Sequence, residues 1–202
     1  MSEGRIQGSL IAFEGLDQSG KQTQAETLRD RAMEAGRDCR LLSFPDYGTA
    51  IGSEISKALH GGREYAPDTM QLLYVANRYE KRESIATLIA AGAIIVCDRY
   101  VASSIAYGEA QGLDPAWLAD IQRYLPKADL TIVLDIAPET AVSRKSTGRD
   151  RYERDLALLS RVRESYLRQS RQDDWLLLNG ERPRADVSAD VVKAAGPLLA
   201  RQ

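Results

Sequence analysis

The stretch FEGLDQSGKQTQ, residues 13–24, leads from an apolar segment into one with helical spacing, through a turn that holds two glycines and a lysine. Residues 15–21 match the pattern GxxxxGK, which is typical of loops that bind nucleotide phosphates between a β-strand and an α-helix. The glycines let backbone amides converge on an anion, the helix adds its positive dipole, and the lysine reaches the outer phosphates. We therefore predict that nucleotide phosphates are bound by residues 15–23, namely Gly15, Leu16, Asp17, Gln18, Ser19, Gly20, Lys21, Gln22 and Thr23.

Gln22 departs from this pattern, because the residue after the lysine is usually a serine or threonine whose hydroxyl binds Mg²⁺. A glutamine amide is a poor substitute, and Thr23 lies about 100° further round the helix. We expect Mg²⁺ to be held by carboxylates and nucleotide phosphates, since it commonly takes few protein ligands. Asp17 and Asp98 are the candidate metal ligands. A carboxylate inside an anion-binding loop also needs a cation beside it, so we expect a metal ion or a lysine next to Asp17.

Short apolar runs recur along the chain at the length of β-strands: SLIAF (9–13), CRLLSF (39–44), AIIVCD (93–98), LTIVLDI (130–136) and WLLL (175–178). They are nearly continuous in hydrophobicity, as expected of strands covered on both faces. Stretches with helical spacing lie between them, such as TQAETLRDRAMEAG (23–36), where Gly36 signals the end of a helix. This alternation predicts an α/β fold with a parallel five-stranded sheet and helices on both faces.

The composition indicates an ordinary globular protein. The 202 residues, 44% of them hydrophobic, fit one domain that spans residues 1–202. The net charge of −2 gives no field that would attract nucleic acid or an anionic membrane, and no apolar run approaches the roughly 20 residues of a membrane span. Cys39 and Cys97 lie in apolar runs without a CxxC pair, which is typical of buried cysteines in a reducing compartment. We expect a cytoplasmic protein.

Three further stretches carry groups suited to a second, anionic substrate: FPDYGTAIG (44–52), LLYVANRYEKRE (72–83) and CDRYVASSIAY (97–107). Together with the FEGLD–GK loop they resemble the thymidylate kinase family, whose members transfer the γ-phosphoryl group of ATP to thymidine monophosphate. The resemblance extends from about Leu10 to about Glu153, and the motifs occur in the family's order. It implies a fold of the P-loop kinase type with a short arginine-rich lid, and it implies that ATP is bound by residues 15–23 and by Arg144. No NKxD motif is present, which argues against a GTPase.

The resemblance implies roles for individual residues. Arg99 and Arg78 would grip the acceptor phosphate and base, since a planar guanidinium matches oxygen acceptors. Tyr74 would stack on thymine and Tyr107 would lie beneath the sugar, although packing in a core or helix explains both tyrosines too. The implied substrate-binding residues are Asp17, Phe44, Pro45, Thr49, Tyr74, Arg78, Arg99, Ser103, Ser104 and Tyr107, with helix capping as the alternative for Ser104.

Two departures from the family concern charge. Tyr47 stands where the family often has an arginine, and Gln18 stands where some members carry a catalytic arginine. The stretch SRKSTGRDRYERD, 143–155, resembles the lid of members that place the catalytic arginine there instead. Arg149 is the first candidate and Arg144 the second; the other lid residues of interest are Lys145, the hinge candidate Gly148, Asp150, Arg151, and Tyr152 and Glu153 at the closing end. A solvated basic turn is the alternative.

The reaction implied is direct in-line transfer, with Lys21, Asp17, Arg99 and Arg149 as the catalytic residues and Mg²⁺ as the cofactor. No general base is needed, because a monophosphate with a second pKa of about 6 is already an oxyanion; His60 is expected to cap a helix end at the surface. Kinases for another monophosphate or a nucleoside, and a nucleotide-binding module with degraded catalysis, remain alternatives. SIATLIAAG (84–92) predicts either a homodimer face, as in the family, or a buried helix.

Overall fold

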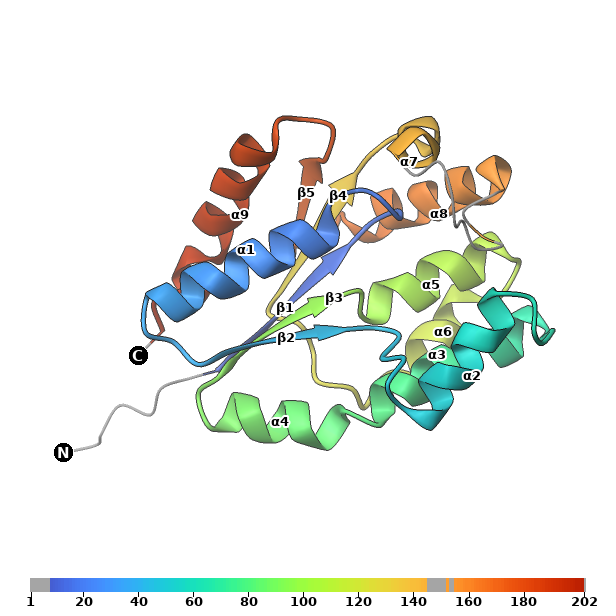
Figure 1. Ribbon diagram of the computed structural model, residues 1–202, viewed down its shortest axis with the longest axis horizontal. Helices are drawn as coiled ribbons and strands as arrows, with labels where there is room; N and C mark the ends of the chain where they lie inside the picture. The colour runs from blue at the N-terminus through green and yellow to red at the C-terminus, as the bar shows by residue number, and fades with distance from the viewer. Residues whose placement is uncertain (1–7, 145–151, 153–154, 202) are drawn as a thin grey trace.

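The computed structural model describes residues 8–144, 152 and 155–201. The strands are β1 (Ser9–Glu14), β2 (Cys39–Ser43), β3 (Ile94–Asp98), β4 (Leu130–Asp135) and β5 (Trp175–Asn179). They form one sheet in the order β2-β3-β1-β4-β5, and every pairing is parallel (Figure 1). The predicted α/β fold with a five-stranded parallel sheet is confirmed, and each predicted strand lies within one residue of its observed bounds.

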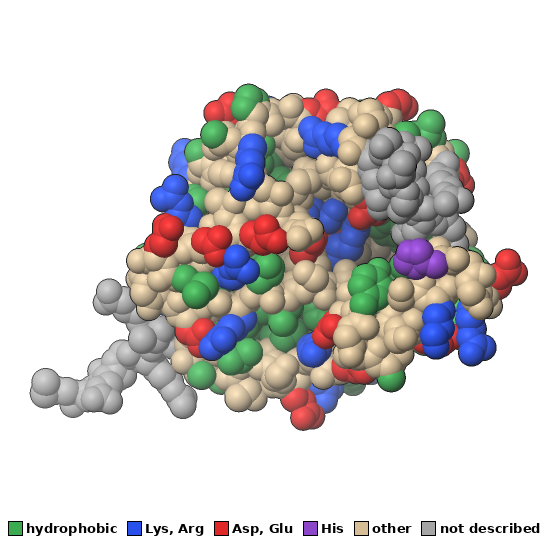
Figure 2. All heavy atoms as spheres, in the orientation of Figure 1, with side chains coloured by type: hydrophobic (Ala, Val, Ile, Leu, Met, Phe, Trp, Pro, Cys, Tyr) green, Lys and Arg blue, Asp and Glu red, His purple; other side chains and the backbone are tan. Residues whose placement is uncertain are grey.

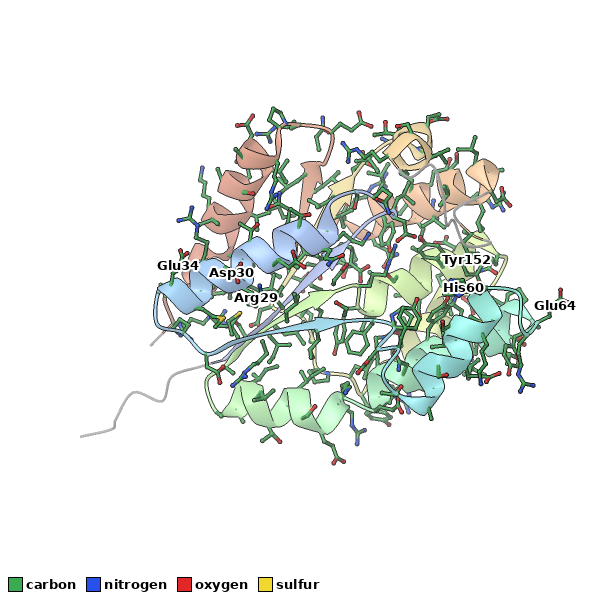
Figure 3. The ribbon with its side chains drawn as sticks, in the orientation of Figure 1. Arg29, Asp30, Glu34, His60, Glu64 and Tyr152 are labelled. Carbon is green, nitrogen blue, oxygen red and sulfur yellow. The ribbon has the colours of Figure 1, made fainter. Side chains whose placement is uncertain are left out.

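The helices of the described residues follow the strands in the expected alternation. They are α1 (Lys21–Glu34), α2 (Ala50–Leu59), α3 (Pro67–Tyr79), α4 (Arg82–Ala90), α5 (Val101–Ala110), α6 (Pro115–Asp120), α7 (Pro138–Arg144), α8 (Leu156–Gln169) and α9 (Arg184–Leu199). Gly36 lies just beyond α1 with a φ of 77°, so the predicted helix stop is confirmed. His60 is also confirmed as an exposed residue at the end of α2, with its ring Nδ1 2.8 Å from the Ser56 carbonyl oxygen (Figure 3).

The core lies on both faces of the sheet because successive residues of a buried strand point to opposite sides. On β1, Ile11 and Phe13 pack with α1 and α9, whereas Leu10 and Ala12 pack on the other side with residues of α4 and the loops beside it. Side chains fill the layers between the sheet and the helices (Figure 3). Both faces of β1 are completely covered, so the phosphate-binding loop begins from the most buried strand of the fold.

The carboxyl ends of the three strands β1, β2 and β3 meet at one edge of the sheet. The register pairs Phe13 with Asp98 and Ser43 with Asp98, so the segments that leave these strands start at the same level. In open parallel sheets this is the edge at which ligands bind. The sequence motifs that begin at residues 13, 44 and 97 are therefore brought together by the topology.

Asn77 fastens the loop that follows β2 to α3. Its side chain is completely buried. The Asn77 Oδ1 accepts a hydrogen bond from the Asp46 amide at 2.7 Å, and its Nδ2 donates to the Asp46 carbonyl at 3.2 Å and to the Thr49 Oγ1 at 3.0 Å. One amide side chain thus holds the backbone of the loop that carries Phe44 and Pro45.

Asn77→Ala is expected to lower the free energy of unfolding by about 2–4 kcal/mol, because several hydrogen bonds are lost and buried polar groups lose their partner. Urea unfolding followed by circular dichroism measures this. Asn179→Ala is the matched control, since Asn179 is exposed and accepts one bond, from the Glu181 amide at 2.8 Å. Equal unfolding midpoints for the two variants would contradict the anchoring role of Asn77.

Candidate active site

The phosphate-binding loop adopts the backbone that its glycines allow. Gly15 and Gly20 have φ angles of 131° and 95°, and a Cβ on Gly15 would lie 2.4 Å from the Leu134 carbonyl oxygen. Gly20 begins α1 and no side chain caps this helix, so its first amides are available to an anion. The Lys21 ammonium folds back over the loop and donates to the Leu16 carbonyl at 2.7 Å. The loop is thus built to hold phosphate groups.

The cation beside Asp17 is an arginine. The Arg99 Nη2 donates to the Asp17 Oδ1 at 2.7 Å, and the Tyr107 hydroxyl lies 3.3 Å from the Asp17 Oδ2. Burial alone would raise the pKa of Asp17, but the charges of Arg99 and Lys21 outweigh burial and hold this pKa far below its usual value. The expected lysine therefore contributes its charge, and the structure adds Arg99, which the end of β3 brings to the loop and which the sequence did not indicate as the partner of Asp17.

Lys21 has an unusual environment for a lysine. Its side chain is buried, and this burial, together with the neighbouring charge of Arg99, lowers the pKa of Lys21 to about 8. Asp17, Asp98 and Glu14 act in the opposite direction and support the protonated form. Lys21 therefore keeps its charge at neutral pH but loses it at moderately alkaline pH.

A buried carboxylate, Glu14, fixes the turn that carries Arg99. The Glu14 Oε1 accepts from the Tyr100 amide at 2.8 Å, and its Oε2 accepts from the Ser103 hydroxyl at 2.6 Å. Arg99 itself has a φ of 65°, and its amide donates to the Phe13 carbonyl at 2.9 Å. Sequence reasoning missed Glu14, although a glutamate directly after an apolar strand and before the loop could have identified it.

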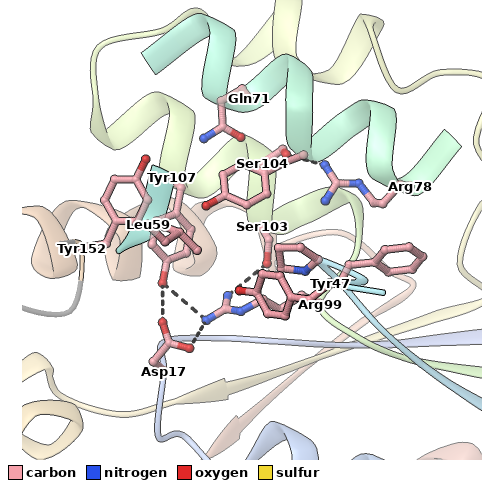
Figure 4. A pocket seen from close by; sticks show the side chains of 13 residues that line it. Asp17, Tyr47, Leu59, Gln71, Arg78, Arg99, Ser103, Ser104, Tyr107 and Tyr152 are labelled. Carbon is pink, nitrogen blue, oxygen red and sulfur yellow. Dashed lines mark hydrogen bonds and ion pairs between the residues drawn. The ribbon is translucent and has the colours of Figure 1, made fainter. Parts of the chain in front are cut away.

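A cavity opens beside this cluster, between the loop, the end of β2 and the helices α3 and α5 (Figure 4). The space-filling view shows this face hollowed near its middle, with Lys and Arg side chains recessed in the hollow (Figure 2). Nearly all of the predicted substrate-binding residues line the cavity: Asp17, Phe44, Pro45, Tyr74, Arg78, Arg99, Ser103, Ser104 and Tyr107. The cavity is therefore the candidate acceptor site.

Thr49 is the exception among these residues. It does not line the cavity. Its hydroxyl caps α2 by accepting from the Gly52 amide at 3.0 Å, and it also accepts from Asn77. The structure thus gives Thr49 a structural role, and its contact with substrate stays a prediction. Ser104 lies in the interior of α5, and the N-cap of this helix is Tyr100. The alternative that Ser104 caps a helix is therefore wrong.

The cavity also contains residues that sequence reasoning did not assign to it. Tyr47, noted only as a departure from the family, lines the cavity and is 51% exposed. Leu59 and Gln71 line it as well, from α2 and α3. Gln71 lies three residues before Tyr74 on one helical face, and this spacing was the signal that could have revealed it.

Arg78 is buried in the cavity wall, and the Nη2 of its guanidinium is hydrogen-bonded within the protein. Its Nη2 donates to the Ser104 hydroxyl and to the Gln122 Oε1, the latter at 2.8 Å. Burial lowers the pKa of Arg78 to about 10, which leaves it charged at neutral pH. Among the described residues its Nε has no hydrogen-bond partner. Arg78, which lines the cavity, therefore retains a buried donor without a partner in the described part of the chain.

Arg144, the second candidate for the catalytic arginine of the lid, contacts the phosphate-binding loop. Its guanidinium donates to the Gln18 carbonyl at 3.0 Å and to the Gly180 carbonyl at 3.2 Å. Gln22 is exposed and its amide donates to Glu26 at 2.9 Å. Arg149 lies outside the described residues, as do the lid residues Lys145, Gly148, Asp150, Arg151 and Glu153. Tyr152 is described and lines the cavity, with its ring 5.8 Å from that of Tyr107.

The fit of a metal ion can be judged from the acidic residues. Asp98 has a buried Oδ1 that lacks a hydrogen-bond partner within the described part of the chain. Both oxygens of Asp17 are taken up by Arg99 and Tyr107. No group of three or more His, Cys, Asp or Glu residues suited to a metal occurs among the described residues. Asp98 therefore fits an ion such as Mg²⁺ that takes one carboxylate together with phosphate oxygens.

Comparison with known proteins decides the family. The family model described as thymidylate kinase matches residues 13–191. The chain belongs to the thymidylate kinase family. It is 33% identical to the thymidylate kinase of Plasmodium falciparum over 194 residues, which cover 96% of this chain and 92% of that protein. It is 34% identical to that of Dictyostelium discoideum over 185 residues, which cover 91% of this chain and 83% of that one.

A solved structure of the thymidylate kinase from Candida albicans agrees with this assignment. It superposes with a TM-score of 0.81 at 29% identity, covering 95% of this chain and 92% of that chain. Members of the thymidylate kinase family are ATP-dependent nucleoside monophosphate kinases, so the chain is a phosphotransferase. Within the described ranges, every helix falls short of the length and apolar character that a bilayer-spanning segment requires.

Proposed function

We propose that this chain transfers the γ-phosphoryl group of ATP to thymidine monophosphate and so supplies thymidine diphosphate for nucleotide biosynthesis. The observation that carries the proposal is the position of Arg99, which pairs with Asp17 of the phosphate-binding loop and also lines the acceptor cavity. A single guanidinium thus stands between the donor and acceptor sites. Such an arrangement suits a reaction that brings two phosphate groups into line.

One set of residues is proposed to bind ATP and another to bind thymidine monophosphate. Lys21 and the amides of the loop bind the ATP phosphates, and Arg99 exchanges part of its contact with Asp17 for the acceptor phosphate. Tyr74 stacks on the base, and Tyr107 fills the space in which a 2′-hydroxyl would lie. The acceptor phosphate attacks as an oxyanion, which agrees with the position of His60 at the surface, away from any role as a base.

Mg²⁺ is the proposed cofactor, and Asp98 is the residue that would hold it with the nucleotide phosphates. When bound, the ion supplies charge neutralisation at the β- and γ-phosphates. Asp17 stays a second, weaker candidate because Arg99 and Tyr107 already occupy its oxygens. The proposal that Arg149 provides the catalytic charge from the lid rests on the sequence alone, with Arg144 supported by its contact with the loop.

The proposal is tested by coupled release of ADP with ATP, Mg²⁺ and each nucleoside monophosphate in turn. Brisk turnover is expected with thymidine monophosphate and little with the others. Brisk turnover with a different monophosphate alone would reassign the acceptor. ATP binding without turnover of any monophosphate would favour a nucleotide-binding module, for which Gln22 and Tyr47 are the supporting departures.

We also propose that the chain is one domain, forms a homodimer and acts in the cytoplasm. The single sheet, with the described helices packed on it or on one another, supports one domain. On α4, Ile85 is buried whereas Ala86 and Thr87 are exposed, so a fully buried helix does not account for SIATLIAAG. Cys39 and Cys97 are free and buried, as expected in a reducing compartment. Light scattering coupled to gel filtration tests the dimer, and a monomeric mass at micromolar concentration would oppose it.

A further inference from the structure

Gln71 is a buried amide without a partner. Its side chain has no exposed surface. Among the described residues, neither its Oε1 nor its Nε2 has a hydrogen-bond partner. Buried amides are almost always hydrogen-bonded, and an unpaired one is costly, so such a group calls for an explanation. Here the explanation lies in the acceptor cavity, because Gln71 is one of the residues that line it.

The aliphatic part of the Gln71 side chain is packed against α5, whereas its amide has no hydrogen-bond partner among the described residues. The backbone of α5 approaches α3 closely, and a Cβ on Gly108 would lie 3.3 Å from the Cγ of Gln71. The close-up shows the amide at the end of this side chain, directed to the side of α3 on which Tyr107 and Ser104 lie, with no interaction drawn to it (Figure 4). Glycine at position 108 permits this approach, and the same Cβ would lie still closer, at 2.5 Å, to Leu118 of α6.

Gln71, Tyr74 and Arg78 lie at positions i, i+3 and i+7, which is one face of α3. Gln71 and Arg78 are about 10 Å apart along the axis, given a rise of 1.5 Å per residue, and both side chains can lean toward a flat ring between them. On this face, two buried polar groups lack a hydrogen-bond partner within the described ranges. One is the Nε–H donor of Arg78, and the other is the amide of Gln71, which offers a donor and an acceptor. They flank the tyrosine that is proposed to stack on the base.

We propose that Gln71 reads the imide edge of the pyrimidine and thereby selects thymine over cytosine. This inference rests on the proposed function. Thymine offers an acceptor at O2, a donor at N3 and an acceptor at O4, whereas cytosine offers acceptors at O2 and N3 and an amino donor at C4. The Gln71 Oε1 accepts from N3–H and its Nε2 donates to O2, while the Arg78 guanidinium donates to O4.

Cytosine mismatches this set at two of its three groups. Its amino group faces the Arg78 donor, and its N3 faces the Gln71 Oε1 as acceptor against acceptor. Turning the amide over pairs Nε2 with N3 but places Oε1 against the O2 acceptor, so a mismatch at Gln71 remains. Sites built to hydrogen-bond a substrate group reject an analogue that leaves buried groups unpaired far more strongly than apolar sites do. Uracil has the same edge as thymine, so Gln71 gives no discrimination between those two bases.

The test compares thymidine and deoxycytidine monophosphates with the full-length enzyme. Gln71→Leu is expected to lower kcat/KM for thymidine monophosphate by about 10–100-fold and that for deoxycytidine monophosphate by less than about 3-fold. Gln169→Leu is the matched control, because Gln169 also has an unpartnered Oε1 but lies outside this cavity.

Calorimetric titration of each monophosphate without ATP gives a second readout that does not depend on phosphoryl transfer. Weaker binding of thymidine monophosphate alone in Gln71→Leu supports the proposal. An equal loss for both nucleotides, or no loss for either, would overturn it and leave Gln71 as a packing residue. If the unmodified enzyme binds both nucleotides but phosphorylates neither, the proposed function fails while the binding ratio still tests Gln71.

Discussion

Arg99→Met is expected to lower kcat/KM for thymidine monophosphate by about 10³-fold, the scale of truncating one partner of a buried charge pair at a binding site. The guanidinium lies 2.7 Å from Asp17, contacts Ser103 at 3.1 Å, and stands over the Tyr107 ring at 5.3 Å from its centroid. Steady-state kinetics with varied thymidine monophosphate measure the loss. Arg63→Met is the matched control, since Arg63 pairs with Glu54 on the surface and is 58% exposed.

The same substitution leaves Asp17, whose side chain is 35% exposed, without its ion-pair partner, so a fall in stability of about 1–3 kcal/mol is expected as well. The double variant Asp17→Asn, Arg99→Met separates the two effects. It should recover part of the lost stability in urea unfolding, because the unpaired charge is gone, yet it should recover little activity. If the double variant regained most of the activity, Arg99 would act only by neutralising Asp17.

Lys21→Met is expected to lower kcat/KM for ATP by about 10³-fold, because a buried charge that contacts phosphate is removed. The environment of Lys21 adds a dependence on pH. Since its pKa in the folded protein is about 8, the free enzyme loses this charge as the pH rises past 8. Bound phosphates favour the protonated form, so ATP affinity should fall above pH 8 and binding at pH 9 should take up close to one proton.

Calorimetric titration of ATP in two buffers with different heats of ionisation measures this proton uptake at pH 7 and pH 9. Uptake near zero at pH 7 is the internal reference. If the uptake at pH 9 persisted in Lys21→Met, another group would be responsible. Protein stability should respond in the opposite sense: the unfolded chain, with a lysine pKa of 10.5, binds more protons between pH 8 and 10.5, so the contribution of Lys21 to stability rises with pH there.

The strands, their parallel order and the phosphate-binding loop could be predicted because each depends on local pattern. Continuous apolar runs give buried strands, and the loop needs its glycines at fixed spacing. The partner of Asp17 could not be predicted this way. Arg99 is 82 residues distant along the chain, and only the register of β1 against β3 brings it to the loop.

Thr49 and Gln71 show that sequence motifs alone do not identify which side chains face the cavity. Thr49 belongs to a motif but lies outside the cavity lining, whereas Gln71 belongs to no motif and lines the cavity. The family pattern around Phe44 places Thr49 near substrate, but the Oγ1 of Thr49 is occupied by the start of α2. Gln71 belongs to none of the motifs, and its importance becomes visible only when α5 packs against it through Gly108. Which polar atoms are left without partners is a property of the packed molecule, so spacing along the chain does not reveal it.

The anchoring of Arg99 to the central strand bears on how base preference can change over evolution. The Arg99 amide donates to the Phe13 carbonyl at 2.9 Å, so β1 and β3 fix the position of the residue proposed to bind the acceptor phosphate. The base-facing residues lie instead on α3, a helix that packs mainly on α2, α4 and α5. A lineage could therefore exchange one nucleobase for another through a few substitutions on a single helix face, while the phosphoryl-transfer apparatus is inherited unchanged.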